Sequence, residues 1–394
     1  MDIVNLEKKY IMQTYKRYEV CFVRGRGQYL WDDKGKKYLD FFAGLSVCNL
    51  GHCHPKIIKS VHNQVDKLIH TSNLYYHKQQ IELAELIIKR SFRNGKVFYS
   101  NSGAEANECA IKLARKYGNL TKNGSEIIVF NNSFHGRTIA TLTATGQKKF
   151  HDGFQPLVPG FKYAEFNNIE SVKKLINKKT SAIMIEPIQG EGGIIPAEKE
   201  FLVELRTLCN KHNLILIYDE VQCGLGRTGE LFAYQYYNVE PDIFTLSKSI
   251  ANGLPLGVTV VKKKYSELFN RGDHGSTFGG NIVSCSAAIE VIKLLNKKYL
   301  DKIKIKSGYL INKLIELKSR HKIIKEVRGV GFMLGMELNI SGTDIVKECL
   351  KHGLVINCTQ DRVLRFLPPF VITRSDIDKA ISILDTTLNK LQNH

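Results

Sequence analysis

The sequence lacks the features of membrane, secreted and disulfide-rich proteins. No uninterrupted apolar run approaches the roughly 18 residues of a membrane helix. The first residues, MDIVNLEKKY, lack the apolar core of a signal peptide. The nine cysteines stand singly, without a CxxC pair, and a packed loop without metal is the favoured interpretation of His52, Cys53 and His54. These absences predict a cytoplasmic protein with reduced thiols and no membrane partner.

The positive charge is not gathered in one place. The chain of 394 residues has a net charge of +19, with 43% hydrophobic and 24% charged residues, which is typical of a globular protein with room for two domains. Lysines occur singly or in short pairs, as at 173–174 and 297–298. Nucleic-acid binding needs basic residues on one face with aromatic residues among them. A lysine-rich solvated surface is therefore the favoured interpretation, and no nucleic-acid partner is expected.

Short apolar runs alternate with helical patterns through the middle of the chain. Strands are predicted at 97–99, 127–130, 182–185, 214–218, 243–246 and 257–261. Helical periodicity occurs between most of them, and also over 57–90 and 282–319. The alternation predicts an α/β fold with a mostly parallel sheet covered on both faces. A hairpin is predicted at 27–38, around the turn DDKG, and a strand pair at 327–337 opens a smaller C-terminal unit.

Two of the predicted strands end in residues that suit one cofactor. The run 214–218 stops at Asp219 and Glu220, and the run 243–246 is followed by Ser247 and Lys248. Ligands of open α/β sheets bind beyond the carboxyl ends of the strands. A desolvated lysine becomes a nucleophile toward an aldehyde, and an acid can hold a cationic ring nitrogen. Together they match the requirements of pyridoxal phosphate.

Three further motifs follow predicted strands. Ser102 and Glu105 in SNSGAEAN have the spacing of a capping box, so a helix begins there; phosphate binding and a plain helix cap are equally good interpretations. The motif NNSFHGR offers Phe134 for stacking and Arg137 for a carboxylate, although each residue type is more often structural. The motif IEPIQGEGG places Glu191 among glycines, as a turn or as a functional acid.

The glycine motif GLGRTG at 224–229 does not indicate a dinucleotide site. That fingerprint requires the glycines to follow a strand directly and to open a helix. Here DEVQC intervenes, and no clear amphipathic helix follows.

Nine ordered motifs carry a resemblance to the class III pyridoxal-phosphate aminotransferases. They are FFAGLSVCNLGHCHP, NSGAEANECAIKLAR, FHGRTIATLTATGQ, EPIQGEGG, YDEVQCGLGRTG, PDIFTLSKSIANGLPLG, HGSTFGGN, VRGVGFMLGMEL and VLRFLPP. The resemblance implies the transferase fold of type I, with a large mostly parallel domain and a smaller α+β domain. The implied division is an N-terminal segment (1–50) packing with the small domain, a large cofactor domain (51–290) and a C-terminal small domain (291–394). The implied active unit is a homodimer.

The resemblance also implies roles around the ring of the cofactor. Lys248 would hold pyridoxal phosphate covalently and then act as the base. Asp219 would pair with the pyridine nitrogen, and Gln222 would bind the phenolic oxygen. Val221 and Phe134 would pack on opposite faces of the ring.

A second set of residues would hold the rest of the cofactor. Ser102, Gly103 and Ala104 would cradle the phosphate, and His135 belongs to the same cofactor site. Thr277 would complete the cradle from the neighbouring subunit.

The implied reaction moves the terminal amino group of N2-acetylornithine to 2-oxoglutarate, by a ping-pong mechanism and in arginine biosynthesis. Arg365 would bind the α-carboxylate of 2-oxoglutarate, and Glu191 would pair with Arg365 while the other substrate is bound. Arg137, Ser276 and Tyr15 would contact acetylornithine. The loop SIANGLP after Lys248 and Ile282 after GGN depart from the usual family pattern, which puts loop geometry in doubt but not the chemistry.

Several alternatives stay open at this point. Ornithine δ-aminotransferase is the second choice, and activity toward succinylornithine or N-succinyldiaminopimelate differs only in the acyl group or chain length. A glutamate-1-semialdehyde aminomutase is disfavoured, because Glu191 and Arg365 suit an exchange of two substrates. A basic nucleic-acid-binding protein that has kept the fold without activity belongs to a different class.

Overall fold

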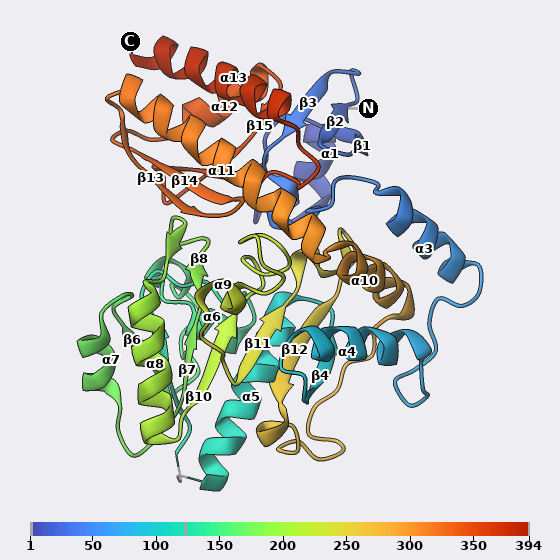
Figure 1. Ribbon diagram of the computed structural model, residues 1–394, viewed down its shortest axis with the longest axis vertical. Helices are drawn as coiled ribbons and strands as arrows, with labels where there is room; N and C mark the ends of the chain where they lie inside the picture. The colour runs from blue at the N-terminus through green and yellow to red at the C-terminus, as the bar shows by residue number, and fades with distance from the viewer. Residues whose placement is uncertain (1–2, 122–123, 393–394) are drawn as a thin grey trace.

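The computed structural model describes residues 3–121 and 124–392 and is built on a seven-stranded sheet (Figure 1). The strand order is β4-β12-β11-β10-β7-β5-β6. Neighbours from β11 to β6 pair in parallel, whereas β12 is antiparallel to both β11 and β4. The strands are β4 (Gly95–Ser100), β5 (Glu126–Phe130), β6 (Phe161–Ala164), β7 (Thr180–Ile185), β10 (Ile215–Asp219), β11 (Ile243–Leu246) and β12 (Gly257–Lys262). The six predicted strands and the mostly parallel sheet are therefore confirmed.

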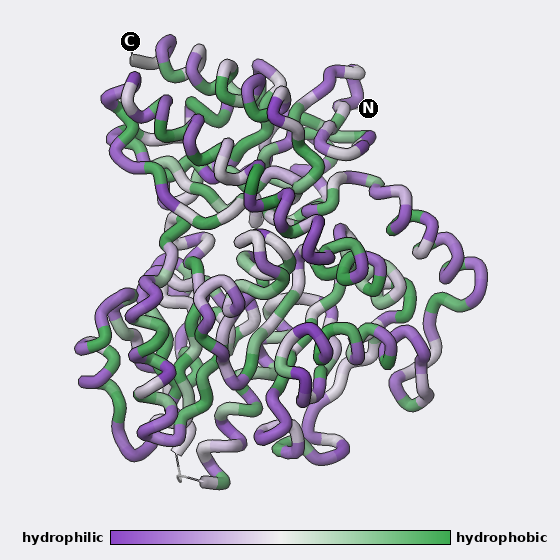
Figure 2. The backbone as a smooth tube through the Cα atoms, viewed as in Figure 1, coloured by the Kyte–Doolittle hydropathy of each residue, from purple (hydrophilic) through white to green (hydrophobic). Residues whose placement is uncertain are grey.

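Both faces of this sheet are covered, because alternate residues of its strands enter two separate cores. Ile128, Ile183 and Leu216 belong to one hydrophobic cluster, whereas their neighbours Ile127 and Ala182 belong to the other. Helix α8 packs into the first cluster and α5 into the second. The helices of this part are α3 (Pro55–Val65), α4 (Lys78–Arg90), α5 (Gly103–Thr121), α6 (Ile139–Ala144), α7 (Ile169–Leu175), α8 (Lys199–His212), α9 (Ala233–Tyr237) and α10 (Ile282–Leu294). Figure 2 shows hydrophobic residues along the central strands and hydrophilic residues on the outer helical turns.

A second, smaller body lies above the large sheet in Figure 1. Its antiparallel sheet has the order β13-β14-β17-β16. Its elements are α11 (Lys297–Arg320), β13 (Ile324–Val330), β14 (Met333–Leu338), α12 (Thr343–Lys351), β15 (Leu354–Val355), β16 (Asn357–Thr359), β17 (Val363–Phe366) and α13 (Arg374–Gln392). The predicted strand pair at 327–337 is confirmed as β13 and β14.

The N-terminal segment joins this smaller body. Strand β3 pairs in parallel with β15, so the first strands and the C-terminal chain share one sheet, β1-β2-β3-β15. The elements are α1 (Ile3–Tyr10), β1 (Phe22–Arg26), β2 (Tyr29–Asp32), β3 (Lys37–Asp40) and the short α2 (Ala43–Ser46). The antiparallel pairing of β2 and β3 confirms the hairpin predicted at 27–38. The domain boundaries at 50 and 290 stay predictions.

Two long stretches that were predicted as continuous helical regions each form two separate helices. The pattern over 57–90 forms α3 and α4, separated by residues 66–77. The pattern over 282–319 forms α10 and α11, because the Asn296 side chain accepts a hydrogen bond from the Tyr299 amide and starts a new helix. Among the described residues, no helix is both long and apolar enough to cross a membrane.

The glycine motif at 224–229 forms a turn that holds the two bodies together. Its Arg227 is fully buried and donates to the Ser46 hydroxyl and the carbonyls of Phe332 and Pro368, at 2.7–3.0 Å, and to the Asn49 side chain. Burial lowers the pKa of Arg227 to about 9. Since α9 begins only at Ala233, the motif does not open a helix as a dinucleotide fingerprint does.

A charged pair ties the N-terminal segment to the loop before α3. The His52 Nε2 lies 2.7 Å from the Asp40 Oδ2, and the other oxygen of Asp40 accepts the amides of Phe42 and Ala43. Burial alone lowers the pKa of His52, but the hydrogen bond and charge of Asp40, with a smaller contribution from Cys48, raise it to about 10.

We expect this pair to make stability depend on pH in the alkaline range. A histidine pKa raised in the folded state stabilises it fully below about 6.5, and this contribution is lost as the pH rises toward 10. The free energy of unfolding should therefore fall by up to about 1.4 kcal/mol per pH unit in that window. His52→Gln should flatten the profile measured by urea unfolding. His54→Gln serves as the control, because the pKa of His54 is lowered and its titration lies below this window. Equal slopes in wild type and His52→Gln would contradict this prediction.

Candidate active site

The predicted acid and lysine lie at one edge of the large sheet. Strands β10 and β11 pair in parallel, with Asp219 opposite Thr245, and Lys248 follows three residues later. Lys248 has a left-handed backbone with φ of 42°, a conformation that a lysine adopts only when its surroundings enforce it. Burial lowers the pKa of Lys248, although the charges of Glu191 and Asp219 act in the opposite direction. A lysine with a lowered pKa offers more of its neutral, nucleophilic form.

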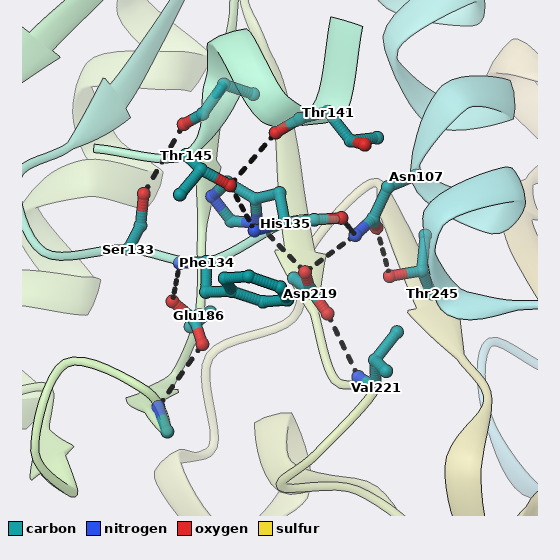
Figure 3. A network of polar contacts seen from close by, with 12 residues as sticks. Asn107, Ser133, Phe134, His135, Thr141, Thr145, Glu186, Asp219, Val221 and Thr245 are labelled. Atoms are coloured by element: carbon teal, nitrogen blue, oxygen red, sulfur yellow. Dashed lines mark hydrogen bonds and ion pairs between the residues drawn. The ribbon is translucent and has the colours of Figure 1, made fainter. Parts of the chain in front are cut away.

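Asp219 is held by three donors (Figure 3). Its Oδ2 accepts a hydrogen bond from the Asn107 Nδ2 at 2.7 Å and lies 2.8 Å from the His135 Nδ1, and its Oδ1 accepts the Val221 amide at 3.0 Å. Asn107 is itself positioned by Thr245, whose hydroxyl donates to the Asn107 Oδ1 at 2.7 Å. The carboxylate is therefore fixed in place before any ligand binds, which suits pairing with a cationic ring nitrogen.

The acid next to it points away from this network. Glu220 accepts the amides of Ala233 and Tyr234 at the start of α9, at 2.5 and 2.8 Å. Burial, with a smaller contribution from Asp219, raises the pKa of Glu220 to about 8. Only Asp219 of the two neighbouring acids therefore belongs to the candidate site.

The start of α5 offers a close-fitting cradle for a phosphate. The Ser102 hydroxyl accepts the Glu105 amide at 3.2 Å, and Glu105 accepts the Asn101 amide at 2.6 Å, so a capping arrangement is present. A Cβ at Gly103 would lie 2.7 Å from the Val221 side chain, which is closer than carbon atoms tolerate. Glycine thus lets the helix start lie against Val221, next to Asp219, and the first amides of a helix are free to bind a phosphate.

Glu191 pairs with Arg365 of β17, and it lies on the glycine-rich loop 189–193, called the glycine loop below. The Arg365 Nη1 lies 2.5 Å from the Glu191 Oε1, and the Arg365 Nε and Nη2 both donate to the Asn357 Oδ1 at 3.0 and 2.7 Å. Gln222 lies beside the pair, within 3.5 Å of both partners. Burial alone raises the pKa of Glu191, but the charge of Arg365 outweighs it and the pKa is lowered. Arg365 is only 2% exposed, so its buried charge needs the carboxylate of Glu191 as a partner.

The three residues predicted to contact acetylornithine are more exposed than Asp219 and Arg365. Arg137 is exposed, and its guanidinium lies 4.0 Å from the ring centre of Phe150 and 5.4 Å from that of Phe134. The Ser276 hydroxyl accepts from the Asn101 side chain at 3.1 Å, one residue before the cradle. Tyr15 is 72% exposed and lies against Arg17. Their roles stay predictions.

Thr277 lies at the surface beside residues 70–73 of its own chain. It is exposed and lines a small cavity with residues 70–73 and with Phe278. Neither Lys248 nor Asp219 lines that cavity.

Three polar residues of this region, of which Asn107 and Glu186 are buried and Asn357 is half-buried, were not predicted as site residues. Asn107 binds Asp219, Asn357 binds Arg365, and Glu186 accepts the amides of Phe134 and Gly190 at 2.9 and 3.2 Å. Asn107 carries a signal, since it lies one helical turn after Gly103 on the face toward the sheet. Asn357 faces Arg365 through the register of β16 and β17, which the sequence does not reveal.

Comparisons with known proteins agree with this geometry. Residues 10–388 match the family model for class-III aminotransferases. The chain is 51% identical to the acetylornithine aminotransferase of Methanocaldococcus jannaschii, covering 99% of this chain and 98% of that protein. It is 48% identical to the same enzyme of Aquifex aeolicus, with 95% and 98% covered.

Solved structures give the same family. The ornithine aminotransferase of Toxoplasma gondii ME49 superimposes with a TM-score of 0.95 at 31% identity, covering 99% of this chain and 95% of that chain. A second structure of that protein has pyridoxal phosphate at partial occupancy in the active site. The acetylornithine aminotransferase of Elizabethkingia anophelis gives a TM-score of 0.87 at 30% identity, with 98% of each chain covered. The chain belongs to the class-III aminotransferases, which use pyridoxal phosphate.

Proposed function

We propose that this enzyme transfers the terminal amino group of N2-acetylornithine to 2-oxoglutarate, giving N-acetylglutamate 5-semialdehyde and glutamate, as a cytoplasmic step of arginine biosynthesis. The observation that carries the proposal is the buried pair of Arg365 and Glu191. It supports a site that must receive a dicarboxylate in one half-reaction and a different amine in the other. The relatives from Methanocaldococcus and Aquifex support acetylornithine as the donor, and nine free cysteines support a reducing compartment.

The residues at the sheet edge fit pyridoxal phosphate. When bound, the cofactor supplies an aldehyde that takes up amino groups and a ring that withdraws electrons. Lys248 would hold the cofactor covalently and would then move a proton at its Nζ. Asp219 would pair with the ring nitrogen, Phe134 and Val221 would enclose the ring, and Gln222 would bind the phenolic oxygen.

The phosphate end is held by the cradle of Ser102, Gly103 and Ala104, with His135 supporting Asp219 behind the ring. Arg137, Ser276 and Tyr15 form the outer region where the donor enters.

Glu191 works as an exchangeable partner for Arg365. While the donor occupies the site, Glu191 neutralises the guanidinium, which avoids an unpaired buried charge. When 2-oxoglutarate arrives, its α-carboxylate takes the place of Glu191 in a forked ion pair. The same site therefore serves both half-reactions of a ping-pong cycle.

Lys248→Ala should abolish covalent retention of the cofactor. The variant keeps the phosphate cradle, so it binds the cofactor reversibly, whereas wild type retains one equivalent per chain after borohydride reduction and denaturation. Mass spectrometry of the denatured chain is the measurement, with Lys262→Ala as the control because Lys262 pairs with Glu240 outside the site. Retained cofactor on the Lys248→Ala chain would mean that another amine forms the bond.

A panel of donors with 2-oxoglutarate tests the substrate. We expect kcat/KM to be highest for acetylornithine, compared with ornithine, succinylornithine and N-succinyldiaminopimelate. Ornithine as the best donor would instead support the second choice, which the Toxoplasma enzyme represents.

Glu191→Ala should lower kcat/KM for the best donor by about tenfold, because Arg365 is then buried without a partner. The value for glutamate should change little, since its carboxylate replaces Glu191. Glu198→Ala, an exposed acid beyond the loop, is the control. Equal losses for both substrates would exclude the exchange of partners.

We also propose that the active unit is a homodimer in which Thr277 serves the partner's phosphate cradle. The exposure of Thr277 and of the apolar Phe278 beside it supports this, as do the exposed Leu74 and Tyr76.

Mixed dimers test this arrangement. Thr277→Ala homodimers should bind the cofactor about tenfold more weakly, through loss of a hydrogen bond to a charged group. A dimer of one Thr277→Ala chain and one Lys248→Ala chain contains one intact site only if Thr277 acts across the interface. Such dimers should retain one tightly bound cofactor per dimer. Retention at the level of the weaker parent would show that Thr277 acts within its own chain.

A further inference from the structure

Glu186 is a buried acid that connects two parts of the candidate site. It follows β7 directly and is 6% exposed. One carboxylate oxygen accepts the Phe134 amide at 2.9 Å, and the other accepts the Gly190 amide at 3.2 Å. Figure 3 shows the acid between Phe134 and the glycine loop, on the side of the network away from Asn107. Phe134 carries the stacking ring, and Gly190 precedes Glu191.

The glycine loop is otherwise fastened on both sides. The Gln189 side chain donates to the Asn131 carbonyl at 2.8 Å, in the segment that carries Phe134. On the opposite side, the Glu191 carbonyl accepts from Thr359 and Gln360, each at 2.8 Å. The backbone beside Glu191 is thus anchored to the large sheet and to the smaller body, and exchange at Arg365 is confined to the Glu191 side chain.

Glu220 is a second buried acid, and its role is structural. Glu220 also accepts two amides, but both belong to the first turn of one helix, α9. Glu186 accepts one amide from the distant Phe134 segment and one from Gly190 of its own loop, and each of the two carries a residue of the site. A single carboxylate that spans two functional segments sets their relative position.

We infer that Glu186 is a positioning residue that couples the ring-stacking segment of Phe134 to the loop of Glu191. This inference rests on the roles proposed above for these two residues. The charged and titratable groups facing Glu186 are His135, Asp219, Lys248 and Cys223. Burial and Asp219 raise the pKa of Glu186, against the opposing effect of His135.

Two independent readouts test the coupling in the holoenzyme. The visible circular dichroism of the bound cofactor reports the stacking of Phe134. The ratio of kcat/KM for the best donor to kcat/KM for 2-oxoglutarate reports the pairing of Glu191 with Arg365. Phe134→Leu should change mainly the first readout, and Glu191→Gln mainly the second.

Glu186→Gln should change both readouts together, with a fall in the ratio of about tenfold from the weakened amide contacts. The matched control is Glu220→Gln, which removes an equally buried acid and should lower the melting temperature without moving the two readouts in concert. Should Glu186→Gln fail to fold, Glu186→Asp keeps the charge but is too short to reach both amides, and the same paired change is expected.

The coupling is wrong if Glu186→Gln lowers only the melting temperature, or alters one readout alone. This outcome differs from failure of the proposed function, in which Glu191→Gln would also leave the ratio unchanged. A normal response of Glu191→Gln together with a silent Glu186→Gln therefore rejects the positioning role and leaves the reaction intact.

Discussion

The structure depends on one constraint, that parallel strands buried on both faces can present charged groups only at their ends. The side chains of β7, β10 and β11 alternate between two hydrophobic clusters and leave no place for a charge within the sheet. Glu186, Asp219 and Lys248 stand at the carboxyl ends of these three adjacent strands. The fold therefore gathers the charged groups of the candidate site at one edge before any loop contributes.

Charges gathered at a buried edge require partners, and the loops and the smaller body supply them. Asp219 is satisfied by Asn107, His135 and a backbone amide, and Glu186 by two amides. Arg365 comes from the smaller body and meets Glu191 of the larger one, so the ion pair also joins the two bodies. Arg227 is satisfied only by neutral acceptors, and the lowering of its pKa is the physical cost of that arrangement.

The sequence predicts those parts of this arrangement that local pattern controls. The buried strands and the meeting of Asp219 with Lys248 follow from short apolar runs and from the geometry of parallel strand ends. The break between α10 and α11 was missed, although Asn296 is a typical helix cap. The bond from Arg365 to Asn357 depends on strand register, and the contact of Glu186 with the Phe134 amide depends on how two separate loops approach each other. No local sequence pattern encodes these two contacts, whereas the contact of Glu186 with Gly190 lies within one short loop.

The division between buried and exposed residues explains why fold alone does not select the donor. Asp219, Gln222 and Arg365 are buried, whereas Arg137 and Thr277 are exposed and Ser276 lies beside the cradle. An ornithine aminotransferase shares the fold at a TM-score of 0.95 with 31% identity, so the backbone fold persists when much of the sequence differs. Changes in the outer residues can alter the donor without disturbing the network that holds Asp219 and Lys248. The identity of 51% with an acetylornithine aminotransferase is thus the stronger guide to the substrate, and under the proposed roles the outer residues would decide that preference.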